Sequence, residues 1–154
     1  MKFIDFCAGI GAGRLGLEKI GLHCIAFAEI NKQAEKTYRE FFGTAEKNHG
    51  NLMLINSTSL PNFDLMIAGF PCQSFSIMGQ RQGMNDDRGQ VINGLIKIMR
   101  EKNLAYFILE NVKGLINHNN GKTLGIILQK LKLAGYKVYH LSLIHISEPT
   151  RQDT

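Results

Sequence analysis

The sequence has no tryptophan, three prolines and three cysteines among its 154 residues. Cys7, Cys24 and Cys72 are odd in number and show no Cys-x-x-Cys spacing, which argues against a disulfide framework and favours a reducing compartment. No apolar run reaches the roughly 20 residues of a membrane span, and Asp5 interrupts the apolar start that a secretion signal would need. We therefore expect a cytoplasmic protein without a membrane segment.

The histidines show no metal-ligand spacing, so we predict no metal site. The apolar content of 44% and charged content of 20% are ordinary for a globular protein, and the length suits one domain. The formal charge of +5 permits an anionic partner such as nucleic acid but does not require one.

Apolar runs typical of strands alternate with stretches of helical periodicity. The predicted strands begin at Phe3 and cover His23 to Ala28, Phe63 to Gly69, Tyr106 to Leu109, and Lys137 to His140. The predicted helices cover Leu15 to Ile20, Lys32 to Phe42 with Asn31 as N-cap and Gly43 as stop, Val91 to Met99, and Leu124 to Leu131. The stretch 44–62 is weakly patterned. This alternation predicts an α/β fold with a doubly wound, mostly parallel sheet.

Three of these strands end in groups that can bind or react. The first runs into a glycine-rich turn at residues 5–13, the third into Pro71-Cys72-Gln73, and the fourth into Glu110-Asn111-Val112. Since ligands bind at the carboxyl ends of strands in open parallel sheets, we expect these three ends to face one cleft.

The segment Gly69-Phe70-Pro71-Cys72-Gln73-Ser74-Phe75-Ser76 resembles the catalytic motif of the cytosine-5 DNA methyltransferases. The turn at 5–11, the segment 79–89 with Asp87-Arg88-Gly89, Glu110-Asn111-Val112 and residues 118–121 resemble further motifs of that family, in the same order. The resemblance covers Phe3 to about His140. It implies a Rossmann-like S-adenosylmethionine-dependent methyltransferase fold, incomplete at the C-terminus.

The resemblance also implies the roles of individual residues. Cys72 would be the nucleophile that adds to C6 of cytosine, and Glu110 would contact N3 and the exocyclic amine of the base. S-adenosylmethionine would be bound by Asp5, Cys7, Ala8, Gly9, Ile10, Gly11, Glu29, Ile30, Asn51, Leu52 and Pro71. The DNA would be contacted by Gln73, Ser76, Gln80, Arg81, Arg88, Asn111 and Val112.

The implied substrate is double-stranded DNA with the target base flipped into the site. The full-length protein would be a monomer and would belong functionally with a cognate restriction endonuclease. Some positions depart from the family pattern: Asn51 stands where an acid usually accepts a bond from the cofactor adenine, and Cys7 and Ile30 stand where aromatic residues are common. We expect these departures to weaken cofactor binding without abolishing it.

We expect residues 1–140 to form part of a catalytic domain whose later Gln-x-Arg-x-Arg motif and target recognition domain are absent, so the chain alone would be inactive. Residues 141–154 resemble the conceptual translation of a transposase adapter used in sequencing libraries, and we expect them to be foreign. The alternative is a genuine edge strand and tail.

Two other functions remain open. A cytosine-5 RNA methyltransferase shares both the cysteine and the Glu110 motif, although Ser74-Phe75-Ser76 looks more like the DNA enzymes. A noncatalytic fragment of a split enzyme would bind cofactor or DNA without trapping a base.

Overall fold

A computed structural model describes residues 1–71 and 90–141 of the chain. The chain forms two compact units, Met1–Val112 and Lys113–Thr154. Within the described ranges, no helix combines the length and the apolar character needed to cross a membrane. The predicted site residues Cys72, Gln73, Ser76, Gln80, Arg81 and Arg88 lie outside these ranges, as do residues 142–154 of the tail.

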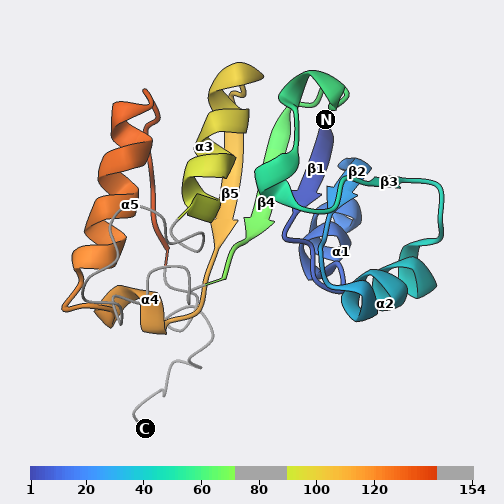
Figure 1. Ribbon diagram of the computed structural model, residues 1–154, viewed down its shortest axis with the longest axis horizontal. Coiled ribbons are helices and arrows are strands. Elements are labelled where there is room, and N and C mark those ends of the chain that lie inside the picture. The colour runs from blue at the N-terminus through green and yellow to red at the C-terminus, as the bar shows by residue number, and fades with distance from the viewer. Residues whose placement is uncertain (72–89, 142–154) are drawn as a thin grey trace, which may run out of the picture. The chain divides into compact units, whose positions relative to one another are not determined.

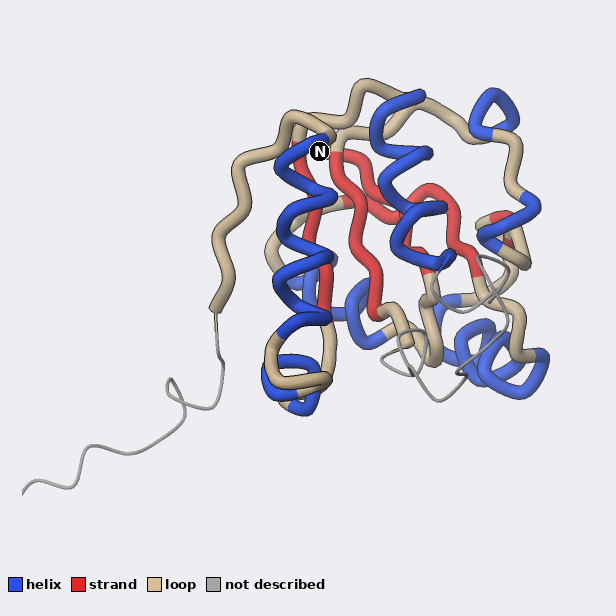
Figure 2. The backbone as a smooth tube through the Cα atoms, turned by 60° about the vertical axis from the view of Figure 1, so that its left-hand side comes forward, coloured by secondary structure: helices blue, strands red, loops and turns tan. Residues whose placement is uncertain are grey.

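The first unit is built on a parallel sheet (Figure 1). Its strands are β1 (Lys2–Phe6), β2 (His23–Ala28), β3 (Lys47–Asn48), β4 (Leu65–Gly69) and β5 (Tyr106–Glu110), in the spatial order β3-β2-β1-β4-β5. All four neighbouring pairs are parallel, and Figure 2 shows the strands running side by side. The predicted α/β fold is confirmed.

The strand order reverses between β1 and β4. From that junction, α1 (Ala12–Lys19) leads to β2 on one side and α3 (Gln90–Glu101) leads to β5 on the other. Because such crossovers are right-handed, the two helices cover opposite faces of the sheet. This reversal is the place where open α/β sheets bind ligands, beyond the carboxyl ends of the strands.

The centre of the sheet is buried on both faces. Successive residues of β1 and β4 are buried, among them Phe3, Ile4, Met66 and Ala68 at 0% exposure. Burial of both faces explains why these strands read as continuous apolar runs rather than as alternating patterns. The edge strand β5 is more open, since Tyr106, Ile108 and Glu110 are exposed.

The second helix, α2 (Lys32–Phe42), has the bounds predicted from the sequence. The Asn31 side chain accepts hydrogen bonds from the N–H groups of Gln33 and Ala34, and Gly43 ends the helix with φ 83°. The apolar side of this amphipathic helix packs against β2 through Tyr38, whose ring stacks on the Phe27 ring with 4.0 Å between the ring centroids. Local capping and one apolar stripe therefore suffice to define this element.

Two regions differ from the sequence prediction. The weakly patterned stretch 44–62 contains β3 and two short 3-10 helices, η1 (Leu52–Leu54) and η2 (Ser57–Ser59). The strand predicted from Lys137 to His140 is wrong: these residues form no strand. A strand needs a neighbour for its backbone hydrogen bonds, and among residues 1–71 and 90–141 none pairs with this segment.

The second unit contains α4 (Gly114–Asn117) and α5 (Lys122–Leu133). Asn119, Asn120 and Gly121 lie between them with φ of 51°, 54° and 79°. This left-handed run turns the chain into α5, and asparagine and glycine are the residues that tolerate it. The His118 Nδ1 and Thr123 Oγ1 atoms, 2.7 Å apart, join the two sides of the turn.

Candidate functional site

The turn after β1 approaches β2 and α2 closely. Cys7, Gly9 and Gly11 adopt φ of 51°, 55° and 92°, and the Ala8 N–H donates to the Ala28 carbonyl over 3.2 Å. A Cβ at Gly11 would overlap the Phe42 ring, whereas a Cβ at Gly9 would meet no atom within 4 Å. One side of the turn is therefore packed, and the backbone at Gly9 is open to a ligand.

Glu29, directly after β2, joins this turn to α2. Its Oε2 accepts the Gly9 N–H and its Oε1 accepts the Asn31 N–H, each over 2.7 Å. The side chain is half-buried. Each carboxylate oxygen has a second lone pair, so a fixed carboxylate can still accept hydrogen bonds from hydroxyl groups.

Asp5 is buried below the turn, with 2% of the residue exposed. Burial raises the pKa of its carboxyl to about 7, against the lowering effects of the backbone hydrogen bond from Arg14 and the Arg14 charge. Its Oδ2 has no hydrogen-bond partner in the described residues. An unsatisfied buried oxygen is costly, and a proton or an additional donor would relieve it.

The other described residues predicted for the cofactor differ in exposure. Ile10 and Ile30 are 54% and 67% exposed, while Leu52 is buried. Asn51 is exposed and its Oδ1 accepts the Met53 N–H over 2.9 Å, which begins η1. Burial, with Glu29 and Asp5 nearby, raises the pKa of the Cys7 thiol to about 12, so Cys7 stays protonated and unreactive at neutral pH.

The ends of β4 and β5 lie together. Gly69 is opposite Glu110 in the parallel register, and a Cβ at Gly69 would lie 3.4 Å from Glu110 Oε2. Asn111 Nδ2 donates to the Phe70 carbonyl over 2.6 Å, while its Oδ1 accepts the Val112 N–H. The Glu110-Asn111 segment is thus bonded to the residue before Pro71. The expectation that β4 and β5 end side by side is confirmed up to Phe70, while the cleft shared with the glycine-rich turn stays a prediction.

Sequence reasoning missed a buried arginine behind the turn. Arg14, 5% exposed, pairs with Glu46 over 3.0 Å and with Glu18 over 2.9 Å, and its guanidinium lies 4.4 Å from the centre of the Phe42 ring. The Arg14–Glu18 spacing of four residues was the one available signal, but it normally marks an exposed helix face. Asn48, which also lies behind the site, gave no signal at all.

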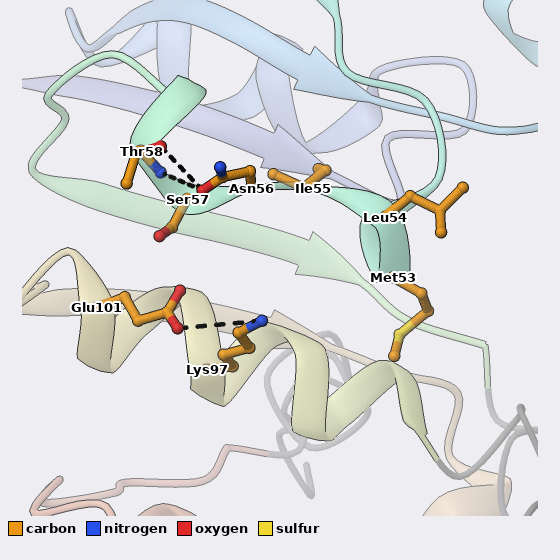
Figure 3. A pocket seen from close by; sticks show the side chains of 8 residues that line it. All are labelled: Met53, Leu54, Ile55, Asn56, Ser57, Thr58, Lys97 and Glu101. Carbon is orange, nitrogen blue, oxygen red and sulfur yellow. Dashed lines mark hydrogen bonds and ion pairs between the residues drawn. The ribbon is translucent and has the colours of Figure 1, made fainter.

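A separate groove of about 530 Å³ lies between η1–η2 and α3 (Figure 3). It is lined by residues 53–58 together with Lys97 and Glu101, which pair over 4.0 Å. None of the described residues predicted for the cofactor or the base lines this groove.

Comparison with known proteins gives consistent matches. Residues 1–147 match the family of C-5 cytosine-specific DNA methylases. The Type II methyltransferase M.BsuFI of Bacillus subtilis is 42% identical over 140 residues, which cover 91% of this chain and 34% of that protein. The orphan methyltransferase M.Rho11sI of Bacillus phage rho11s is 40% identical over 141 residues, covering 90% of this chain and 28% of that protein.

The fold is likewise shared with a solved structure. DNMT2 of Spodoptera frugiperda superimposes with a TM-score of 0.69 at 26% identity, over 86% of this chain and 41% of that one. The chain thus spans about a third of the length of the curated relatives it matches.

Proposed function

The chain belongs to the C-5 cytosine-specific DNA methylase family, and from this membership we propose that it supplies the cofactor site, nucleophile and acidic partner of a DNA (cytosine-5-)-methyltransferase. The observation that carries the proposal is the pairing of Gly69 with Glu110, together with the Asn111–Phe70 hydrogen bond. Both contacts hold the end of β5 next to Gly69 and Phe70, which precede Cys72 in the sequence, and this supports a proposed site at the same end of the sheet as the glycine-rich turn.

The cofactor site that we propose fits S-adenosylmethionine, which when bound supplies an electrophilic methyl group. The half-buried Glu29 carboxylate would accept hydrogen bonds from the ribose hydroxyls, with the open backbone at Gly9 beside it. Asn51 Oδ1 would accept the adenine amino group, next to the apolar Leu52. The rest of the proposed set consists of Asp5, Cys7, Ala8, Ile10, Gly11, Ile30 and Pro71. The buried, unsatisfied Asp5 Oδ2 is consistent with a further polar partner there.

The proposed reaction begins with Cys72. A thiolate at Cys72 would add to C6 of the cytosine, which makes C5 nucleophilic enough to take the methyl group. Glu110 would hold the base at N3 and the exocyclic amine as negative charge builds on the ring. Loss of the C5 proton and breaking of the bond from Cys72 to C6 would then return the thiolate. The buried Cys24 and the protonated Cys7 are unsuited to this role.

We propose double-stranded DNA as the substrate, with the target cytosine flipped out of the duplex. The segment 113–141 contains five lysines and no acidic residue. Lys113, Lys122, Lys132 and Lys137 are exposed, a charge pattern that favours phosphate binding. The proposed DNA contacts are Gln73, Ser76, Gln80, Arg81, Arg88, Asn111 and Val112. Of these, Asn111 donates a hydrogen bond from its side chain to the Phe70 carbonyl.

We further propose a cytoplasmic, monomeric enzyme that protects DNA from a cognate restriction endonuclease. Residues 1–140 would form the first part of its catalytic domain, with residues 141–154 outside it. An RNA methyltransferase and a noncatalytic binding fragment are the other outcomes that an assay must separate.

The test is a methyl-transfer assay on the complete protein that contains this chain, with tritium-labelled S-adenosylmethionine. Duplex DNA should become labelled and transfer RNA should not, and Glu110→Gln should reduce labelling strongly. Labelling of transfer RNA alone would support the RNA enzyme. Cofactor binding without any labelling would support the noncatalytic fragment.

A further inference from the structure

Asn48 makes an unusual set of contacts at the end of β3. Its Oδ1 accepts the Glu29 N–H over 3.0 Å and the Gly50 N–H over 2.8 Å, and its Nδ2 donates to the Glu29 carbonyl over 3.0 Å. The side chain therefore bonds to both backbone groups of Glu29 and to the turn that follows β3.

The position of Asn48 explains this geometry. The parallel pairing of β2 with β3 covers only Ala26 with Lys47 and Phe27 with Asn48, and the His49 N–H still reaches the Phe27 carbonyl over 2.8 Å. At Glu29 the side-chain amide of Asn48 makes the hydrogen bonds that a backbone peptide unit of β3 would make if the strand continued. The main chain after β3 can therefore turn away from β2 at Gly50, which has φ 67°.

The amide also influences the first turn of α2. Hydrogen bonding from Asn48, and then from Lys32 and Arg39, lowers the pKa of Glu35 to about 2. The hydrogen bonds of the Asn48 side chain join two segments, the end of β2 and the turn at 49–51. These segments carry the carboxylate of Glu29 and the amide of Asn51.

We propose that Asn48 is a positioning residue of the cofactor site, which fixes the Glu29 carboxylate relative to the Asn51–Leu52 segment so that both can contact one adenosine. This inference rests on the proposed cofactor site and adds a residue that touches no cofactor atom itself. A side chain satisfied at both ends of its amide is rigid, and rigid support is what keeps binding groups in register.

Calorimetric titration of S-adenosylhomocysteine, and separately of adenosine, into the 154-residue chain tests the proposal. Asn48→Ala should weaken both ligands by about tenfold or more, which corresponds to the loss of one or two hydrogen bonds. The matched control is Asn56→Ala. Asn56 caps η2 by accepting the Thr58 N–H over 3.1 Å, so its loss should change affinity by less than about twofold.

A double-mutant cycle separates positioning from general stability. If Asn48 acts through Glu29, Asn48→Ala should cost much less affinity in a Glu29→Gln background than in the wild type. All titrations are made at a temperature where circular dichroism shows each variant folded. Equal costs in both backgrounds would overturn the proposal, and so would wild-type affinity in Asn48→Ala.

Asn48→Asp provides a second variant in case Asn48→Ala does not fold. The aspartate keeps the oxygen that accepts the Glu29 and Gly50 N–H groups, but it replaces the donating Nδ2 by a second oxygen that faces the Glu29 carbonyl. Protonation of this carboxyl would supply the missing donor. The affinity of this variant relative to wild type should therefore recover as the pH falls from 8 to 5.5, and a constant ratio would contradict the proposal. Failure of the wild type to bind either ligand would instead defeat the cofactor site as a whole.

Discussion

The Gly9 N–H donates a hydrogen bond of 2.7 Å to Glu29 Oε2, which ties the turn after β1 to the end of β2. The second carboxylate oxygen of Glu29 accepts the Asn31 N–H over the same distance. The acid proposed to bind the ribose therefore also holds the glycine-rich turn against α2. The carboxylate of Glu29 therefore stabilises the turn, and in the proposed site it would also bind the ligand.

We predict that Glu29→Gln weakens binding of S-adenosylhomocysteine by at least about tenfold and costs about 1–3 kcal/mol of stability. The new amide nitrogen must face one of two backbone N–H groups, because both carboxylate oxygens are acceptors. Calorimetry and urea denaturation measure the two effects. Glu40→Gln, the same charge change at an exposed position of α2, should alter neither, and unchanged affinity in Glu29→Gln would remove this residue from the site.

Gly11→Ala should destabilise the first unit by about 3 kcal/mol or more. The substitution meets two penalties, a left-handed φ of 92° and overlap with the Phe42 ring. Gly21→Ala is a matched control, since its φ is 85° but a Cβ there meets no atom within 4 Å. It should lose only about 1–2 kcal/mol. Equal losses in the two variants would show that the Phe42 contact is unimportant.

Asp5 should make stability depend on pH. Burial raises the pKa of its carboxyl from 3.8 to about 7, so the folded chain holds a proton that the unfolded chain releases. The Asp5 contribution should be least unfavourable below pH 4, grow more unfavourable up to about pH 7, and stay constant above. Asp5→Asn removes this cost. Its advantage over the wild type in denaturant titrations should reach a few kcal/mol near pH 8, and a pH-independent difference would refute the account.

The buried pair of Arg14 and Glu46 should matter more than an exposed pair. Arg14→Ala leaves the Glu46 carboxylate, whose side chain is 15% exposed, without the guanidinium 3.0 Å away. We expect a loss of about 3–5 kcal/mol in thermal or urea unfolding. Lys97→Ala breaks the exposed pair with Glu101 and should cost less than about 1 kcal/mol. Similar losses in both variants would contradict the structure.

The elements with strong local signals were predicted well. Lys32–Phe42 was predicted to the residue because Asn31 and Gly43 cap it, and His23–Ala28 because its apolar run ends at a charged residue. The strand ends that carry the candidate site followed from the rule for parallel sheets. The start of β4 and the extent of α5 were placed less accurately. Phe63 extends the apolar pattern ahead of β4, and the ends of α5 include polar residues such as Lys122 and Lys132 that apolar periodicity does not mark.

Features that depend on distant partners were not predictable. β3 has only two residues and exists because it pairs with β2, and its Asn48 side chain adds hydrogen bonds to Glu29 just after β2. No pattern in 44–62 reveals these partners. Arg14 belongs to an ordinary helical sequence, and only the fold brings Glu46 and Phe42 around it. The false strand at 137–140 shows the reverse, a local apolar pattern that lacks a partner in the described part of the chain.

Covalent trapping tests the central claim most directly. The complete protein that contains this chain is incubated with S-adenosylmethionine and duplex DNA carrying 5-fluorocytosine at the target site, where fluorine at C5 prevents release of the thiol. We predict a denaturation-resistant protein–DNA adduct that Cys72→Ser abolishes and Cys24→Ser, at a buried position, leaves intact. An adduct that survives Cys72→Ser, or no adduct with the wild-type protein, would contradict the account.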